Sequence, residues 1–233
     1  MGTSKGYIPP TRPEWSKAKR AVSIYLRNND LESKKKAVAK YAEARHIDGI
    51  KGTAGETPFA HAVGKILSFV KNISDNGLDE ALNRFDRNDL IGKSPETIVH
   101  EMLDDFTNHG ATAEDSLALA ALATAFEVLK IETPDDLVNM NLDLFLLEVI
   151  IAFVNHDFDF RFYEKISQGR TPKETCDILG DVHGYINCTL RNQLTSANIR
   201  KINLNRMRNN EIVFKMLDDA FDVCMTIYEE NTQ

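Results

Sequence analysis

The dipeptide His156-Asp157 comes nearest to a catalytic motif in this sequence. In all-α metal-dependent phosphohydrolases, a His-Asp doublet on a helix joins a distant His and a distant Asp around a divalent metal that activates water. The other ligands would come from His100 or His109 and from Asp177 or Asp181. These histidines lack the paired spacing of a metal site, and a lone His-Asp pair is common by chance. A metal-dependent phosphohydrolase is therefore an alternative, and not the favoured interpretation.

A second chemical candidate is Gly92-Lys93-Ser94, which matches the end of a phosphate-binding P-loop. The position that should hold the first glycine of that loop is Arg87, and no strand is expected before it. Without a strand, the backbone nest that holds phosphate has no scaffold, so we exclude nucleotide hydrolysis. Asp181-Val182-His183 is a weaker candidate, and the sequence contains no GxSxG or HExxH motif.

Residues Thr171–Leu194 can be drawn as a helix-turn-helix, with Gly180 or Gly184 near the turn. The charged side chains of this segment sum to −1, whereas a helix that enters the major groove of DNA carries more positive charge. We therefore expect two packed structural helices in this segment, and no direct contact with nucleic acid.

The charge of the chain is divided unevenly along its length. Residues 1–45 hold 11 Lys and Arg against 4 Asp and Glu, whereas residues 46–233 hold 17 against 31. A basic front can bind nucleic acid, an acidic partner or the chain's own acidic remainder. The run Lys34-Lys35-Lys36 falls in a helical pattern, and we expect it to form a solvated face. A basic nucleic-acid adaptor stays open as an alternative, although the acidic remainder would repel a duplex.

Helical periodicity dominates the elements that must position these residues. Apolar residues recur at a spacing of three and four in three stretches, which run from Trp15 to Tyr25, from Ile98 to Phe106 and from Val213 to Ile227. The segment LDLFLLEVIIAFV, residues 142–154, is apolar nearly all round and predicts a buried central helix. Alternation with a period of two occurs only over residues 158–162, which is too short for a sheet. We predict an all-α fold, an irregular helical bundle with a flexible basic N-terminal tail.

Four prolines follow a Ser or Thr, and each such pair predicts a helix start. The hydroxyl accepts a backbone N–H at the N-cap, and proline at the next position loses a donor that has no partner there. With the Thr112 and Asp115 pair, which imitates a capping box, the predicted starts lie near residues 58, 95, 113, 134 and 172. The four proline-led starts are 37, 39 and 38 residues apart. Since the intervals differ in content, an irregular domain is favoured over a helical repeat.

The segments between these features define four regions. They are a flexible tail (1–13), basic N-terminal helices (14–46), a Gly-rich linker (47–57) and a helical body (58–233). No apolar run reaches the roughly 18–20 residues of a membrane span, and the N-terminus lacks the apolar core of a signal peptide, so we expect a cytoplasmic protein. Three cysteines without CxxC spacing indicate reduced thiols, and Cys224 on an apolar face is expected to be buried.

The N-terminus, Met1-Gly2-Thr3-Ser4, offers the chemistry of a free amine. Because glycine is second, we expect Met1 to be removed, which leaves an unhindered α-amine with an ordinary pKa of about 7.7–8.0. N-myristoylation would use the same glycine, but its pattern requires Ser or Thr at position 6, where this chain has Gly6. The other interpretation is an ordinary chain terminus without a function of its own.

A longer pattern joins this N-terminus to the helices. It consists of the MGTS start, a basic helix led by tryptophan (Trp15–Leu26), a small-residue linker, and the segments GLDEALNRF, DLIGKSPETIVHEMLDDF and GATAEDSLALAALATAFEVL. In order and spacing, over most of residues 1–165, this pattern resembles the QatB family of bacterial Qat anti-phage systems. The tail of this chain is shorter and contains less glycine than the family pattern.

The resemblance implies a four-part system of a P-loop ATPase, the QatB protein, an enzyme similar to the deazaguanine synthase QueC, and a TatD-like nuclease. It implies that this chain is a non-enzymatic partner of the QueC-like enzyme. Gly2 would accept a deazapurine group, with Thr3 and Ser4 as recognition context, and no cofactor or metal is expected. QueC-type chemistry activates a carboxylate with ATP, and an amine is the nucleophile that this reaction requires. Residues 7–13 would thread toward the partner's active site while Trp15 anchors the chain nearby.

Overall fold

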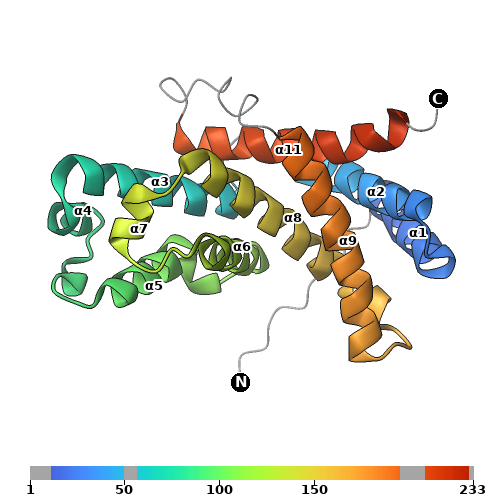
Figure 1. The fold of residues 1–233 in the computed structure, drawn as a ribbon, viewed down its shortest axis with the longest axis horizontal. Helices are drawn as coiled ribbons and strands as arrows, with labels where there is room; N and C mark the ends of the chain where they lie inside the picture. The colour runs from blue at the N-terminus through green and yellow to red at the C-terminus, as the bar shows by residue number, and fades with distance from the viewer. Residues whose placement is uncertain (1–11, 50–56, 195–207, 231–233) are drawn as a thin grey trace.

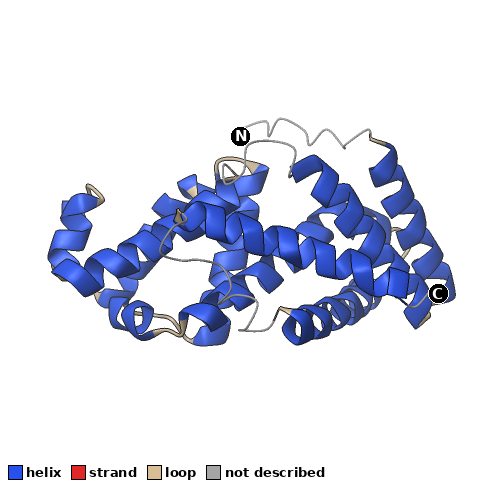
Figure 2. Cartoon of the chain, turned by 90° about the horizontal axis from the view of Figure 1, so that it is seen from above, coloured by secondary structure: helices blue, strands red, loops and turns tan. Residues whose placement is uncertain are grey.

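The structure, a computed structural model, describes residues 12–49, 57–194 and 208–230. Within these ranges every regular element is a helix, which confirms the all-α prediction (Figures 1 and 2). The α-helices are α1 (Pro13–Asn28), α2 (Leu31–Gly49), α3 (Pro58–Asn76), α4 (Leu78–Arg84), α5 (Pro95–Phe106), α6 (Ala113–Leu129), α7 (Pro134–Asn139), α8 (Leu142–Ser167), α9 (Pro172–Gln193) and α11 (Asn209–Glu230). Two short 3₁₀ helices, η1 (Asn88–Leu90) and η2 (Asn108–Gly110), flank α5.

The predicted helix starts are confirmed at all five positions. α3, α5, α6, α7 and α9 each begin directly after a Ser or Thr whose hydroxyl accepts a backbone N–H at 3.1 to 3.3 Å. The four helices that begin after a Ser-Pro or Thr-Pro pair have 19, 12, 6 and 22 residues. Helices this unequal are not copies of one repeat unit, so the near-equal spacing of their caps does not make a solenoid.

Helix α8 runs through the middle of the molecule and supplies much of the core (Figure 1). It extends well beyond the apolar segment 142–154, over 26 residues in all. Phe158 and Phe162 are fully buried, whereas Phe160 is 39% exposed. The phenylalanines at 158 and 162 are therefore one helical turn apart on the core side, and the period of two is a coincidence of helical spacing.

The prediction of two packed helices within Thr171–Leu194 is wrong, because α9 is one continuous helix over this segment. A buried stripe of Val182, Ile186 and Leu190 holds it against the body. Glycine inside a helix costs about 1 kcal/mol relative to alanine, which burial of three aliphatic side chains outweighs. The two glycines of the expected turn lie on the exposed face, at positions 180 and 184.

The helices form two ends that α8 and α11 join (Figure 1). At one end, α3 to α7 pack together, and at the other, the antiparallel pair of α1 and α2 packs against α8, α9 and α11. Helix α11 lies along both α3 and α2, so the C-terminal helix contacts each end of the molecule. None of the described helices combines the length and the apolarity that a membrane crossing demands.

Candidate functional site

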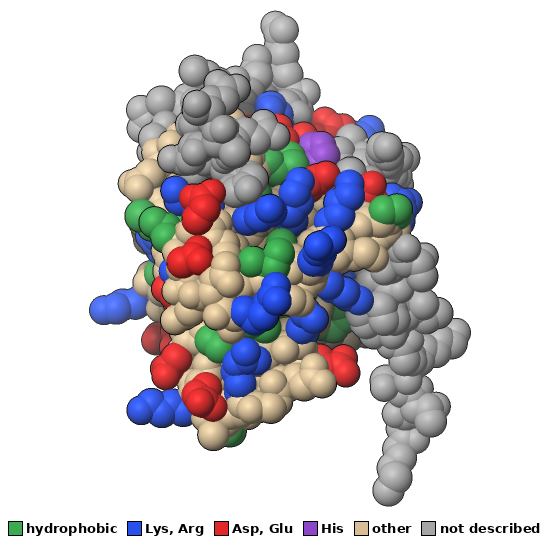
Figure 3. All heavy atoms as spheres, turned by 90° about the vertical axis from the view of Figure 1, so that its right-hand side faces the viewer, with side chains coloured by type: hydrophobic (Ala, Val, Ile, Leu, Met, Phe, Trp, Pro, Cys, Tyr) green, Lys and Arg blue, Asp and Glu red, His purple; other side chains and the backbone are tan. Residues whose placement is uncertain are grey.

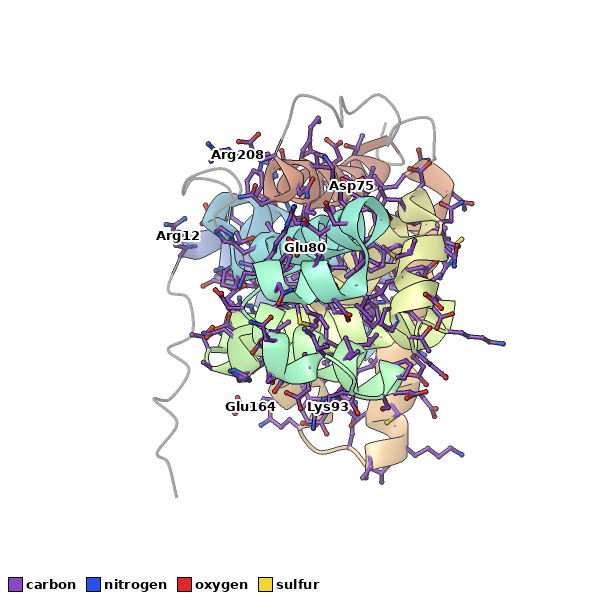
Figure 4. The ribbon with its side chains drawn as sticks, turned by 90° about the vertical axis from the view of Figure 1, so that its left-hand side faces the viewer. Arg12, Asp75, Glu80, Lys93, Glu164 and Arg208 are labelled. Atoms are coloured by element: carbon purple, nitrogen blue, oxygen red, sulfur yellow. The ribbon has the colours of Figure 1, made fainter. Side chains whose placement is uncertain are left out.

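The predicted acceptor residues Gly2, Thr3 and Ser4 lie outside the described residues. What the structure does show is the point at which the chain enters the fold. Arg12 has extended backbone and lies at the periphery (Figure 4), and α1 begins with a proline at the next position. Proline suits the first position of a helix because its fixed φ is already helical. The backbone N–H of Trp15 donates to the Arg12 carbonyl at 3.2 Å, which fixes this entry point.

Trp15 is the anchor at this entry point, with an exposed fraction of only 1%. Its ring lies 6.5 Å from the ring of Tyr41 on α2 and 6.3 Å from that of Phe162 on α8, measured between centroids. The guanidinium of Arg161 lies over the indole, 5.2 Å from its centroid. Aromatic and cation–π contacts of this kind each contribute about 0.5–1.5 kcal/mol beyond burial. Helices α1, α2 and α8 therefore hold position 15 from several sides.

A buried ion network lies beneath Trp15 and consists of Tyr41, Arg45, Glu114, Asp157 and Arg161. Asp157 is completely buried, and two arginines pair with it, through Arg45 Nε at 3.2 Å and Arg161 Nε at 3.3 Å. The Tyr41 hydroxyl donates to Asp157 at 2.9 Å, and burial raises the pKa of this hydroxyl well above its ordinary value. Glu114 accepts from Arg45 at 3.0 and 3.1 Å and completes the charge balance. Such pairing is what a carboxylate needs in a dry core.

The network argues against the alternative interpretation of His156-Asp157 as a metal site. Asp157 faces two fixed positive charges, where a divalent cation would be repelled. His156 faces another way, and its Nε2 lies 2.9 Å from the hydroxyl of Thr124 on α6. Burial lowers the pKa of His156, which favours the neutral ring. The geometry therefore gives the doublet a structural role in place of metal binding.

The other candidate ligands come from α5, η2 and α9. His100 is exposed on α5, and His109 pairs with Asp104 at 3.0 Å, which raises the pKa of the imidazole. Asp177 is exposed on α9. Within the described ranges, none of these residues forms a cluster of three potential metal ligands with His156 or Asp157.

The weaker motif Asp181-Val182-His183 is also accounted for by packing. Asp181 accepts a hydrogen bond of 2.7 Å from the Tyr25 hydroxyl of α1 and pairs with Lys34 of α2, and these contacts lower the pKa of its carboxyl. His183 Nε2 lies 2.8 Å from Asp159 of α8. Asp181 therefore links α9 to α1 and α2, and His183 links α9 to α8.

The P-loop-like triplet Gly92-Lys93-Ser94 forms the turn that leads into α5. Gly92 has a φ of +78°, a left-handed conformation that glycine adopts without strain. The Ser94 hydroxyl caps α5 by accepting from the backbone N–H of Thr97 at 3.3 Å. Lys93 lies at the periphery (Figure 4). The triplet is a glycine turn followed by a helix cap.

The prediction that Lys34-Lys35-Lys36 forms a solvated face is wrong for its first two residues, whose side chains are 13% and 17% exposed. Helix α2 packs against α1, α9 and α11, and Lys34 and Lys35 pair with Asp181 and Glu32. The pairs of Lys34 with Asp181 and of Arg45 with Asp157 show the basic front meeting the chain's own acidic part. Exposed basic residues remain on α1, and they are Lys17, Arg20 and Arg27. Figure 3 shows Lys and Arg gathered on the end of the molecule that α1 and α2 occupy.

The cysteines fit the sequence-based expectation. Cys224 is 2% exposed on α11, and burial raises the pKa of its thiol to about 12, so the thiol stays protonated. Cys176 and Cys188 are free and exposed on α9. The buried cysteine therefore acts as a small apolar side chain of the core.

Sequence reasoning missed most of the buried ion network. The pairs Tyr41 with Arg45 and Asp157 with Arg161 are each four residues apart on one helix, a spacing that brings side chains together. That signal was present in the sequence. The contacts between helices, such as Glu114 of α6 with Arg45 of α2, leave no comparable local pattern.

A family model described as QatB, Qat anti-phage system associated protein, matches residues 57–224 of the chain. No curated protein and no solved structure matches it. The matched range begins at the N-cap of α3 and ends within α11, so it contains Asp157 and Arg161, whereas Trp15 and α2 precede it. Because the match covers well over half of the chain, the protein belongs to the QatB family of Qat anti-phage systems.

Proposed function

We propose that this chain is the cytoplasmic, non-enzymatic partner of the QueC-like enzyme of its defence system, and that it offers the α-amine of Gly2 as acceptor of a deazapurine group. Membership of the QatB family supports a role in a Qat system. Thr3 and Ser4 are the recognition context of the acceptor. The P-loop ATPase and the TatD-like nuclease of the system are the further partners in this proposal.

The proposed step is acyl transfer to nitrogen. The neutral amine of Gly2 attacks the carboxyl carbon of a deazapurine carboxylic acid that the partner enzyme has activated with ATP. A C–N amide bond forms, the activating group leaves with the electron pair of the broken C–O bond, and the amine nitrogen loses one proton. The QatB-family chain contributes only the nucleophile, so it needs no base or metal of its own for this step.

The observation that carries the proposal is the fixed entry point at Arg12 and Trp15. Ten residues separate Gly2 from Arg12, which limits the distance between their Cα atoms to about 36 Å. An acceptor within that distance of a fixed position can reach an active site recessed in a docked partner. If Trp15 were exposed and unpacked, the starting point of the tail would not be defined.

The exposed basic residues Lys17, Arg20 and Arg27 lie on the same helix as the entry point. A basic surface attracts an acidic one and raises the rate of association. We place the docking surface for the partner enzyme here, next to the first residue of α1. The tail and the docking surface then act together, because docking raises the local concentration of the amine at the active site.

Transfer to the purified chain tests this proposal. The chain, the QueC-like enzyme, ATP and a labelled deazapurine carboxylic acid are combined, and label per chain is counted. We expect one label per chain in the unchanged protein and in a Gly6→Ala control, and none in Gly2→Pro, whose ring nitrogen is hindered. Label at the unchanged level in Gly2→Pro would contradict the proposal.

The same basic end favours one competing function, a nucleic-acid adaptor (Figure 3). Deleting residues 1–45 is not a usable test, because it removes Trp15 and Tyr41 from the core. A variant with Lys17, Arg20 and Arg27 each changed to Gln keeps the core intact. DNA affinity that falls with salt and is lost in this variant would favour the adaptor. We expect instead that the unchanged chain does not bind DNA at physiological salt.

A further inference from the structure

Helices α2 and α11 face each other through three side chains that can ligate a metal, His46, Asp218 and Asp222, here called the His46 triad. His46 Nδ1 lies 3.1 Å from Asp218 Oδ1 and 3.6 Å from Asp222 Oδ1. Within the described ranges, this is the one group of three such residues whose ligand atoms all lie within 4.8 Å of one another. No sequence motif indicated it, because 172 residues separate His46 from Asp218.

The two distances from His46 are close to the edge length of a coordination tetrahedron. Asp218 and Asp222 are four residues apart, so they share one face of α11, and His46 approaches that face from α2. Zinc bonds of about 2.0–2.1 Å to nitrogen and oxygen give a tetrahedron edge of about 3.3–3.4 Å. The two measured distances from His46 bracket this value.

Two of these ligand atoms, His46 Nδ1 and Asp218 Oδ1, are buried and form no hydrogen bond, as is also the case for Arg45 Nε beside Asp157. Their separation is short, but the two atoms are not aligned as donor and acceptor. Polar atoms out of reach of water are nearly always satisfied in folded proteins. A cation between the two atoms would satisfy both at once.

We propose that the His46 triad binds one divalent transition-metal ion, with zinc preferred, and that the ion fastens α2 to α11. An imidazole with two carboxylates suits zinc better than magnesium or calcium, which favour oxygen ligands. The two carboxylates balance the charge of the ion. The neighbouring Arg45 does not oppose it, because Asp157 and Glu114 already neutralise that guanidinium. The inference is independent of the proposed acceptor function.

Equilibrium dialysis of the untagged full chain against zinc, manganese or magnesium chloride, with metal analysis, tests the site. We expect one zinc ion per chain, weaker binding of manganese and no retained magnesium. Loss of even an outer-shell partner commonly weakens metal binding by about 10- to 100-fold, so we expect losing a ligand to weaken zinc binding by at least about 100-fold. The ligand variants are His46→Ala and Asp222→Asn. Asp222 is 55% exposed, so its variant should fold even if His46→Ala does not.

Two controls separate this site from others. Asp219→Asn changes an exposed aspartate on the same helix that pairs with Lys215, and it should bind zinc as the unchanged chain does. His156→Ala should also keep the ion, because His156 contacts Thr124 and lies outside the triad. A chain that retains no zinc, or zinc binding that survives both His46→Ala and Asp222→Asn, would overturn the proposal.

Discussion

Arg45 and His46 are neighbours on α2, yet they face two acidic clusters of different character. Arg45 enters the buried ion network, where Asp157 is fully buried and contacts two guanidinium groups and a hydroxyl. His46 belongs to the His46 triad, in which the side chains of His46 and Asp218 are 32% and 30% exposed. The network is built from permanent positive charges, whereas the triad combines one imidazole with two carboxylates.

This difference indicates which cluster stabilises the fold and which can bind a ligand. A buried carboxylate whose oxygens are already paired with fixed donors cannot bind a further ligand. Removing one of its partners leaves an uncompensated charge in the core. The triad is partly exposed and contains no guanidinium partner, so it can accept an ion at little cost to the fold. The network therefore supports the entry point of the tail, and the triad is the candidate ligand site.

The largest expected effect comes from breaking the network at its centre. Asp157→Ala leaves Arg45 and Arg161 without their shared carboxylate, and we expect a loss of about 3–5 kcal/mol in the free energy of unfolding. Urea unfolding measures it. The matched control is Asp159→Ala on the same helix, which removes the partly exposed pair with His183 and should cost about 1 kcal/mol or less. Equal losses of unfolding free energy in the two variants would show that the burial of Asp157 does not make it more costly to remove than Asp159.

A smaller loss is expected from Arg161→Lys, which keeps the charge and removes the planar fork. Lysine cannot both stack on Trp15 and donate to Asp157 as the guanidinium does. We expect a loss of about 1–3 kcal/mol, the cost of a buried acceptor left with fewer donors. Near-ultraviolet circular dichroism should report the change around the tryptophan. An unchanged spectrum and an unchanged unfolding midpoint would show that Arg161 does not contribute to the packing of Trp15.

The pH dependence of stability tests the buried environment of His156. Burial lowers its pKa below the ordinary 6.5, so the unfolded chain binds a proton first as the pH falls. Stability should therefore decline below roughly pH 6.5 as the neutral ring is lost. His156→Gln, which keeps a polar contact to Thr124, should lose less stability between about pH 7 and pH 5 than the unchanged chain does. Thr124, Asp159 and His183 are the polar and charged groups near this ring. The same pH measurement on Asp159→Asn is therefore a second test. Parallel pH curves for the unchanged and His156→Gln proteins would contradict the assignment.

The smallest effect is expected at the triad in the presence of a chelator. His46→Ala removes a partly exposed pair, and we expect a change within about 1 kcal/mol in the free energy of unfolding without metal. With zinc added, only the unchanged chain should gain stability, because the ion binds the folded state. Thermal unfolding in both conditions measures this contrast. A loss as large as that of Asp157→Ala would make the triad a structural cluster like the network.

The sequence predicted the fold class and five helix starts because these depend on local chemistry. A Ser or Thr before a proline caps a helix regardless of what the helix contacts later, as at Thr57 and Thr171. The continuity of α9 through Gly180 and Gly184 was missed, because the buried stripe that sustains it gains its energy from other helices. Local turn signals were outweighed by tertiary packing.

The candidate sites were harder to predict. His156-Asp157 was weighed as an alternative because of its chemistry, but neighbouring residues on a helix point about 100° apart, and the two side chains contact different helices. Arg45 and Glu114 are 69 residues apart in sequence, and no local pattern pairs them. Asp218 and Asp222 share one face of α11, but only the packing of α2 on α11 brings His46 to them.

The most direct test of the central claim is the intact mass of the chain purified from cells that express the complete defence system, compared with cells lacking the QueC-like enzyme. The account predicts a mass increase of one deazapurine acyl group after loss of Met1, confined to the N-terminal peptide that begins with Gly2 and absent without the enzyme. An unmodified Gly2 terminus in the presence of the complete, active system would contradict it.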